Sequence, residues 1–412
     1  MENISTILLC LSTVTDKTTL RHLALISEAL LSMNGRVTML GISRWTERGG
    51  SYRTIQRFFG KNLSWCRIQW HLIRSQPGRK DDVVLLTADE TTVTKSGKTT
   101  HGLGRYFSSI YNRAVPGLSF FSVSLVSVRQ RRAFPIVMEQ VEKTEKGVEK
   151  SKKTRRKPGR PKGCPNKNRS QPELSEHLLW IQAILRNVLR LIGSSLTPVY
   201  FVYDNAMAHN EAVAMLKPLN LHLISKLRCN AALWFPNVGT YSGRGAPRKY
   251  GEKVDYSRIP DAYLKDSEVT DGILTDIYQM QVWHKRFASM LNVVIIRKTN
   301  VKTGKIAQVV LFSTDLEQPR DKLIEYYRLR FQIEFTFRDA KQYWGLEDFM
   351  NTGATQVYNA ANLSMFMVNL SYALRQQDGF SDMGVLDLKT WFRAGKYVRE
   401  TLKQLQHSAD RD

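Results

Sequence analysis

Two short runs of apolar and β-branched residues, each followed at once by an aspartate, constrain the fold of this chain most. One run leads to Asp89 and the other to Asp204. Runs of this kind, bounded by turn signals, are typical of strands inside a sheet. An ionised carboxylate beside a buried strand loses hydration unless a cation or a hydrogen-bond donor offsets the cost. We therefore expect an α/β protein with two acids at strand ends, although a single aspartate there also suits a turn or a cap.

A third acid, Glu334, lies in a charged segment that predicts a helix over residues 325–341. Tyr327, Arg330, Glu334 and Lys341 stand at offsets of 0, 3, 7 and 14 residues. At 3.6 residues per turn these offsets fall within an arc of about 60° on one helix. No Pro or Gly interrupts the segment, so one continuous helix is expected, with Arg330 or Lys341 as the partner of the carboxylate. A structural ion pair on an amphipathic helix is the alternative interpretation.

Together the three acids, Asp89, Asp204 and Glu334, suggest a shared site for a divalent cation. Carboxylate oxygens without thiolate ligands favour Mg²⁺, with Mn²⁺ as a substitute, over zinc. The four cysteines are far apart and form no zinc-site spacing, which is typical of reduced cysteines in a cytoplasmic protein.

The spacing Y-x2-R-x3-E-x6-K, preceded by two strands that end in Asp, resembles a DDE transposase of a bacterial insertion sequence. It is similar to the cut-and-paste subgroup that carries this signature, and the resemblance covers roughly residues 82–345. It implies a ribonuclease-H-like catalytic core interrupted by a β-rich insertion. The implied activity is Mg²⁺-dependent DNA cleavage and strand transfer at the terminal inverted repeats of the element and at target DNA. A homodimer that pairs two DNA ends, in the cytoplasm and associated with the nucleoid, is also implied.

The resemblance assigns roles residue by residue. Asp89, Asp204 and Glu334 would be both the catalytic triad and the metal ligands, and Tyr327, Arg330 and Lys341 would contact DNA phosphates. Asp89 is preferred over Glu90 because it fits the first-strand pattern, and neighbours on a strand point to opposite faces. Two rival functions stay open: a non-catalytic DNA-binding protein derived from a transposase, and a ribonuclease-H-like nuclease without strand transfer.

The charge of the chain is consistent with a nucleic-acid partner. Lys and Arg number 61 against 37 Asp and Glu, a formal net charge of +24 over 412 residues. Such an excess favours a polyanion, since neutralising phosphates releases counterions and supplies most non-specific affinity. No segment has the length and apolar character expected of a membrane span.

Residues 1–78 predict a helical domain that resembles a helix-turn-helix. Ser51 is expected to cap a short helix over residues 52–59 that Gly60 ends. Arg53 and Arg57 would project outward to contact DNA, while the apolar residues pack inward. A small helical hairpin that binds no DNA has the same outline.

The remaining chain divides into four further parts. The first part of the catalytic core is expected over residues 79–228, as three strands that pair antiparallel, a helix, the strand before Asp204, a helix and another strand. A β-rich insertion follows over 229–307, the second part of the core over 308–350, and a helical C-terminal region over 351–412.

Residues 150–169 form a basic stretch without any acid, which is typical of disorder in the absence of a partner. Arg160 and Lys162 lie in a Gly-Arg-Pro core that resembles an AT-hook, in which the Arg would enter a narrow minor groove. A solvated linker with non-specific attraction to phosphates is the alternative.

Two tryptophans of the insertion, Trp234 and Trp283, are candidates for stacking on a flipped base, a role that the resemblance implies for an aromatic residue of this region. A core position is the alternative for each of them.

Overall fold

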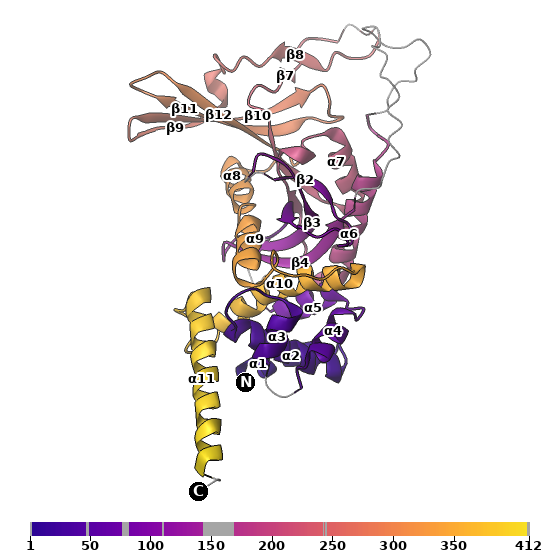
Figure 1. Ribbon diagram of the computed structural model, residues 1–412. Helices are drawn as coiled ribbons and strands as arrows, with labels where there is room; N and C mark the ends of the chain where they lie inside the picture. The colour runs from indigo at the N-terminus through magenta and orange to yellow at the C-terminus, as the bar shows by residue number, and fades with distance from the viewer. Residues whose placement is uncertain are drawn as a thin grey trace.

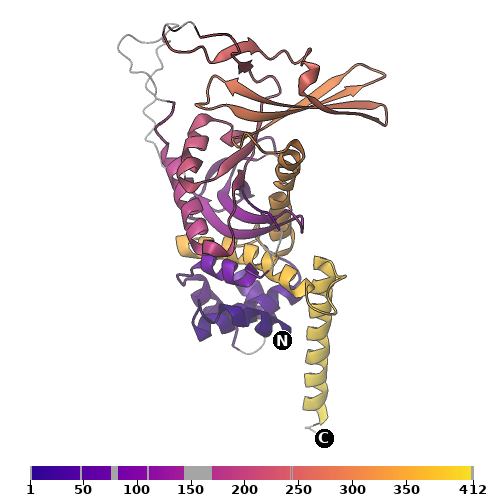
Figure 2. The same ribbon diagram turned by 180° about the vertical axis from the view of Figure 1, so that it is seen from behind.

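The computed structural model describes residues 2–46, 49–75, 82–108, 111–142, 169–241, 243 and 245–409. The architecture is mixed α/β, with a large mixed sheet and helices at both ends of the chain (Figures 1 and 2). The N-terminal helices and α11 lie at one end of an elongated molecule, and strands β7 to β12 form the other. No helix in these described ranges is long and apolar enough to cross a membrane.

The helices of the N-terminal half are α1 (Glu2–Leu8), α2 (Lys17–Ser32), α3 (Met39–Trp45), α4 (Tyr52–Phe59), α5 (Trp65–Ile73), α6 (Glu176–Ile192) and α7 (Asn210–Leu216). Those that follow are α8 (Arg320–Leu329), α9 (Gln332–Tyr343), α10 (Ala354–Arg375) and α11 (Val385–Ala409). Short 3₁₀ turns are η1 (Leu9–Leu11), η2 (Gly193–Ser195), η3 (Asn205–Met207), η4 (Lys217–Leu219) and η5 (Asp261–Tyr263).

The strands before the insertion are β1 (Val84–Thr94), β2 (Gly104–Ser108), β3 (Arg113–Ser127), β4 (Arg132–Val141), β5 (Tyr200–Val202) and β6 (His222–Leu227). Those from the insertion onward are β7 (Leu233–Pro236), β8 (Tyr250–Lys253), β9 (Leu264–Thr270), β10 (Ile273–His284), β11 (Leu291–Asn300) and β12 (Ile306–Ser313).

One half of the sheet follows the order that the sequence predicts. Strand β3 pairs antiparallel with both β1 and β4, whereas β5 lies parallel to β1 and β6 parallel to β5. The predicted antiparallel trio is therefore confirmed, and the arrangement is consistent with a ribonuclease-H-like core. Strand β2, which pairs with β3, is an addition that the sequence did not indicate.

The sequence predicts that Asp89 ends its strand, but the structure places it in the middle of β1. Strand β1 continues to Thr94 because Glu90 and the four residues after it keep pairing with β3. The apolar run stops at Asp89, yet the ladder of backbone hydrogen bonds does not depend on side-chain polarity.

The expected β-rich insertion is joined to the same sheet. Strand β12 pairs antiparallel with β6, and β11, β10 and β7 follow it in order, with β9 on β10 and β8 on β7. The boundary expected between residues 307 and 308 falls inside β12. Because the ladder is continuous from β1 to β12, the insertion is coupled to the core through backbone hydrogen bonds.

The two faces of β1 bury against different helices. Leu85 packs in a small cluster with Leu323 and Leu329 of α8, whereas Leu86 and Ala88 belong to the larger core that α6 and α7 cover. Since side chains alternate along a strand, this division assigns each later residue of β1 to one face or the other.

Helix α10 is buried on nearly every side and binds the N-terminal helices to the sheet. The Asn359 amide donates to the carbonyls of Phe59 and Lys61 and accepts from the Trp65 indole, while Asn362 donates to Met138 of β4. These buried asparagines satisfy backbone groups of segments far apart in the sequence. Helices α5 and α10 therefore lie against β4, with the other N-terminal helices beyond them (Figure 1).

Helix α4 forms as the sequence predicts. Ser51 accepts from the Thr54 amide at its start, and Gly60 follows its last residue. Ile55 and Phe58 are fully buried, while Arg53 and Arg57 are exposed.

Helix α11 is anchored on α2 partly by a buried lysine, and this predicts a pH-dependent stability. The Lys389 ammonium donates to the Leu30 carbonyl, and burial lowers its pKa to about 8 from an ordinary value of 10.5. Between these values the folded state binds fewer protons than the unfolded state, so stability rises with pH. We expect the unfolding free energy of the wild type, relative to Lys389→Met, to increase between pH 7 and pH 10.5 by about 3 kcal/mol. Urea unfolding at several pH values measures this difference, and parallel curves would contradict it.

Candidate active site

The segment that carries Glu334 is two helices, not one. Helix α8 ends at Leu329 and α9 begins at Gln332, with a break at Arg330 and Phe331. Four amides around the break bond to carbonyls three residues earlier instead of four: those of Arg330, Phe331, Ile333 and Glu334. Such 3₁₀-type bonds tighten the turn without needing Pro or Gly, which is why the sequence did not reveal the break.

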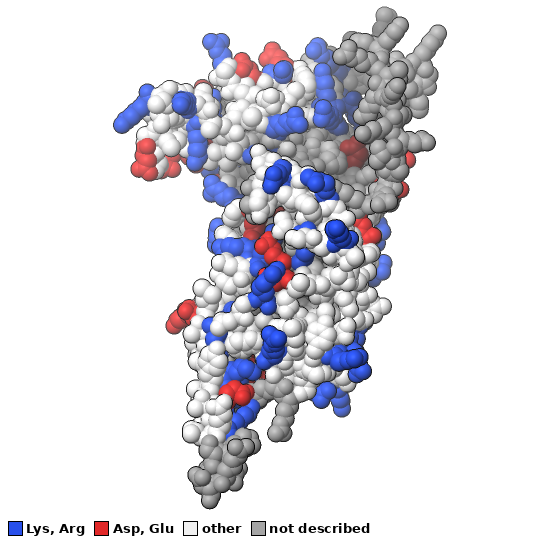
Figure 3. Space-filling view, in the orientation of Figure 1, with Lys and Arg blue, Asp and Glu red and all other residues white. Residues whose placement is uncertain are grey.

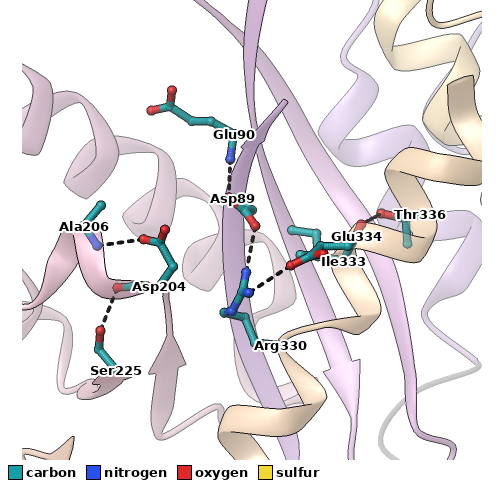
Figure 4. Close-up of polar contacts among 9 residues, drawn as sticks. All are labelled: Asp89, Glu90, Asp204, Ala206, Ser225, Arg330, Ile333, Glu334 and Thr336. Carbon is teal, nitrogen blue, oxygen red and sulfur yellow. Dashed lines mark hydrogen bonds and ion pairs between the residues drawn. The ribbon is translucent and has the colours of Figure 1, made fainter. Parts of the chain in front are cut away.

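Arg330, at this break, joins two of the predicted acids. Its Nη1 lies 2.7 Å from Oδ2 of Asp89, and its Nη2 lies 2.9 Å from Oε1 of Glu334 (Figure 4). The side chains of Arg330, Asp89 and Glu334 are 14%, 22% and 40% exposed. The expectation that Arg330 partners Glu334 is confirmed, and the guanidinium is shared with an acid 241 residues away.

Strand register brings Asp204 near Asp89. Thr87 of β1 pairs with Val202 of β5, and because the strands are parallel, two further residues along each bring Asp89 level with Asp204. Adjacent strands lie about 4.8 Å apart, and residues two apart share a face. Asp204 follows β5 and caps η3, accepting from the Ala206 amide, while its carbonyl accepts from Ser225 (Figure 4).

Glu90 points to the opposite face of the sheet from Asp89. Its carboxylate lies 3.7 Å from Nε2 of His177 on α6 and 3.5 Å from the hydroxyl of Ser119. Figure 4 shows its side chain directed away from Arg330. Of the two neighbouring acids, Asp89 is therefore the one that joins Arg330 and Glu334.

The carboxylates influence one another electrostatically. Burial raises the pKa of Asp89 to about 6, and the charges of Asp204 and Glu334 add to the rise, against the lowering effect of Arg330 and the Glu90 amide. Burial lowers the pKa of Arg330, but the neighbouring Asp89 and Glu334 outweigh it, so the net shift is upward. Asp89 therefore stands where negative charge is concentrated and only partly neutralised.

Tyr327 lies at the same site, whereas Lys341 of α9 contacts β1 at a point beyond Asp89. Burial raises the pKa of the Tyr327 phenol, and its other neighbours include Arg330 and Asp204. Lys341 donates to the Thr92 carbonyl, three residues beyond Asp89, and pairs with Glu347 at 3.2 Å.

The other predicted DNA-binding residues lie away from these acids. Arg53 and Arg57 are on α4 among the N-terminal helices, and Trp283 is on β10 near the opposite end of the molecule (Figure 1). Arg160 and Lys162, with most of the AT-hook-like stretch, lie outside the described residues.

Trp283 belongs to a group of aromatic and basic side chains that the sequence only partly indicated. It pairs across the strands with Trp234, and the Tyr250 ring stands edge-on to both tryptophans at 6.0 Å. The Lys285 ammonium lies 4.4 Å from the Trp234 ring centroid, and Lys249 lies 5.5 Å from that of Trp283. Both tryptophans are half-buried rather than core residues. The signals in the sequence were a lysine directly before Tyr250 and another two residues after Trp283.

The donor set of Asp89, Asp204 and Glu334 suits a hard divalent cation, since it offers only carboxylate oxygens. Within the described ranges no three acidic, His or Cys side chains already converge on one point. Instead, the Arg330 guanidinium lies between Asp89 and Glu334 and supplies the positive charge. The chemistry of these residues therefore fits Mg²⁺, provided that Arg330 releases at least one carboxylate.

Comparison with protein families matches residues 10–289 to the family described as DDE superfamily endonuclease. The matched range includes Asp89 and Asp204 and ends before Glu334. Comparison with curated proteins finds no match. A family match over more than half of the chain shows that this protein belongs to the DDE superfamily of endonucleases.

Proposed function

We propose that this protein is a cut-and-paste transposase of a bacterial insertion sequence, which cleaves the ends of its element and joins them to target DNA. Membership of the DDE superfamily implies the coarser activity, DNA cleavage, in a family that generally uses divalent metals. The subgroup, the recognition of inverted repeats and the strand transfer are proposals, supported by the Y-x2-R-x3-E-x6-K spacing.

The observation that carries the proposal is that Arg330 binds both Asp89 and Glu334, while Asp204 lies near enough for its charge to act on Asp89. The three acids come from β1, from the end of β5 and from α9, which are separate in the sequence. A purely structural ion pair would need one acid for Arg330, whereas burial, together with two acidic neighbours, opposes the ionisation of Asp89. Strongly perturbed carboxyls of this kind are typical of functional sites.

Asp89, Asp204 and Glu334 would hold Mg²⁺, with Mn²⁺ as a substitute. When bound, the metal supplies Lewis-acid activation of the attacking oxygen and stabilisation of the leaving 3′ oxygen. The protein contributes positioning: β1 and β5 fix two carboxylates through their register, and Arg330 fixes the third. Once released from Asp89, the Arg330 guanidinium is placed to contact a phosphate of the scissile strand, with Tyr327 beside it.

More distant residues would hold the DNA on either side of the acids. Arg53 and Arg57 on α4 present exposed cations for phosphate or base contact. Lys341 would contact the DNA backbone near β1. Trp283, with Trp234, Tyr250 and two lysines around it, offers a half-buried aromatic surface on which a flipped base could stack.

The proposal is tested by cleavage of a plasmid that carries the DNA flanking this gene on both sides. With Mg²⁺ or Mn²⁺, the wild type is expected to release the flanked segment and to produce joined ends. Cleavage without joined products would indicate a nuclease without strand transfer. Tight binding without any cleavage in either metal would indicate a DNA-binding protein derived from a transposase.

The basic run over residues 152–167 gives a separate prediction for DNA binding. It contains eight Lys and Arg and no acid. Each phosphate contact that is lost reduces the slope of log affinity against log salt by about 0.9. Deletion of the run is expected to weaken binding to duplex DNA and to flatten that slope, which titrations at several salt concentrations measure. An unchanged slope would show that the run contacts no phosphates.

A further inference from the structure

Arg132 and Arg375, which we call the arginine pair, are part-buried cations without an acidic partner. Arg132 begins β4 and Arg375 ends α10, and these two elements pack against each other (Figure 1). Among the described residues, neither guanidinium donates a hydrogen bond or forms an ion pair, and the Nε atom of each is enclosed without an acceptor. A part-buried charge of this kind is costly, because it loses hydration and gains no partner in return.

Two other arginines with an enclosed nitrogen are neutralised by acids. Arg297 and Arg320 also have one nitrogen without an acceptor, but Nη2 of Arg297 lies 2.9 Å from Asp276, and Nε of Arg320 lies 3.0 Å from Asp321. Many Lys and Arg elsewhere stand on the surface, where water hydrates them, as Figure 3 shows for one face of the molecule. The arginine pair has neither arrangement, so its positive charge requires an anion from outside the chain.

Tyr372 of α10 fixes the orientation of Arg132. The guanidinium carbon lies 4.1 Å from the centroid of the Tyr372 ring, and the phenol donates to Oε1 of Gln130 at 2.9 Å. Stacking covers one face of the guanidinium, while its N–H donors lie in the guanidinium plane and stay unsatisfied. Arg375 follows Tyr372 by three residues, which makes the two side chains neighbours on the surface of α10. A planar donor set held in place by an aromatic ring suits an oxyanion.

The charges around Arg132 also favour a bound anion. Burial lowers the pKa of Arg132 to about 10 from an ordinary value of 12.5, and the charge of Arg375 lowers it as well, against the raising effects of Tyr372 and Asp339. Asp339 is itself paired, because its carboxylate lies 3.0 Å from Arg338. The repulsion within the arginine pair is therefore only partly offset, and one bound anion would relieve it.

We propose that the arginine pair is a binding site for a phosphate group, with the Nη groups of both side chains as donors. Phosphate oxygens accept charge-assisted hydrogen bonds from guanidinium groups in a favourable planar geometry. Pairing across the strands puts Arg132 level with Ser127 of β3 and Val84 of β1. Asp89 is five residues further along β1, about 17 Å away and on the opposite face of the sheet. The phosphate site is therefore separate from the catalytic acids.

Two sources carry such a group: the DNA backbone and a free phosphate anion. Only the first source rests on the proposed function, since the site itself is argued from the burial of the arginine pair and its lack of acidic partners. The free anion is therefore tested first, in the absence of DNA, and duplex DNA second.

The first measurement is urea denaturation of the full chain, in potassium phosphate and in potassium chloride of equal ionic strength. A ligand that binds only the folded state multiplies the folding equilibrium constant, by about elevenfold at ten times its dissociation constant. Phosphate is expected to raise the denaturation midpoint of the wild type, and the double variant Arg132→Gln and Arg375→Gln to lose most of this rise. In chloride the double variant should be at least as stable as the wild type, because it removes an uncompensated charge.

The double variant Arg67→Gln and Arg190→Gln is the matched control, because both arginines are exposed and the same charge is removed. It should keep the wild-type response to phosphate, including any general effect of the salt on stability. Binding to a DNA duplex of arbitrary sequence at several salt concentrations then identifies the source. Loss of one backbone contact flattens the slope of log affinity against log salt by about 0.9. An unchanged slope, with the response to phosphate lost, identifies a free anion.

The inference is overturned if the Arg132→Gln and Arg375→Gln variant keeps both the phosphate response and the salt slope of the wild type, or if the control loses them equally. It is also overturned if the wild type responds to phosphate no more than to chloride and the slope is unchanged. Should the double variant fail to fold, Arg375→Gln alone is measured in the same way and should lose a large part of the response. Plasmid cleavage enters none of these measurements, so the proposed function can fail while the phosphate site stands.

Discussion

Glu334→Gln is expected to reduce the rate of DNA cleavage by about a thousandfold or more while leaving DNA binding intact. A metal that polarises the reacting oxygens contributes several kcal/mol to transition-state stabilisation, and about 4 kcal/mol corresponds to this factor. Gln keeps the size of Glu and an acceptor for Arg330 Nη2, so the fold should not change. Removal of a negative charge should leave the affinity for DNA the same or slightly higher. Cleavage of the flanked plasmid and binding of the same DNA measure both quantities.

Glu268→Gln is the control for this substitution, since Glu268 is exposed on β9 and its carboxylate lies away from Arg330. It should cleave at the wild-type rate. Loss of binding together with cleavage in Glu334→Gln would show that the residue supports the DNA-bound fold rather than the reaction. Cleavage at the wild-type rate by Glu334→Gln would show that Glu334 is not part of the catalytic site.

Arg330→Gln is expected to destabilise the metal-free protein by about 2 kcal/mol. Breaking a buried ion pair costs about 3–5 kcal/mol because the remaining charge is uncompensated, and partial exposure of Asp89 and Glu334 reduces the cost here. Addition of Mg²⁺ should restore part of the lost stability, since the cation replaces the guanidinium between the carboxylates. Chemical denaturation with and without Mg²⁺ measures the effect.

A second substitution separates charge from packing at this site. If Arg330→Gln lowers the stability because it leaves carboxylates unpaired, adding Asp89→Asn to that variant should recover much of the lost stability. Arg328→Gln, at an exposed position on α8, should change stability by no more than about 0.5 kcal/mol. An Arg330→Gln variant as stable as the wild type, or one that Asp89→Asn destabilises further, would contradict the role of Arg330 as the counter-charge of Asp89 and Glu334.

Local patterns in the amino-acid sequence determine much of the fold without reference to tertiary contacts. Apolar runs predict the strands at β1, β5 and β6, because burying such side chains favours an extended, paired backbone. A capping serine and a following glycine predict α4 to the residue, since these side chains satisfy groups that a helix end leaves unpaired. The break between α8 and α9 was not predictable, because a 3₁₀ turn needs no special residue.

For the candidate site too, some features follow from the sequence and others only from the tertiary structure. The sequence by itself determined which acids are available, that a cation stands four residues before Glu334, and that Asp89 and Glu90 face opposite ways. These properties depend on residue type and on the periods of helix and strand. Only the tertiary structure decided that Asp89 and Asp204 are level, because strand register depends on pairing across 115 residues. It also decided that Arg330 lies between Asp89 and Glu334, and that Arg132 and Arg375 come together without an acid, since burial and pairing depend on what packs against each face.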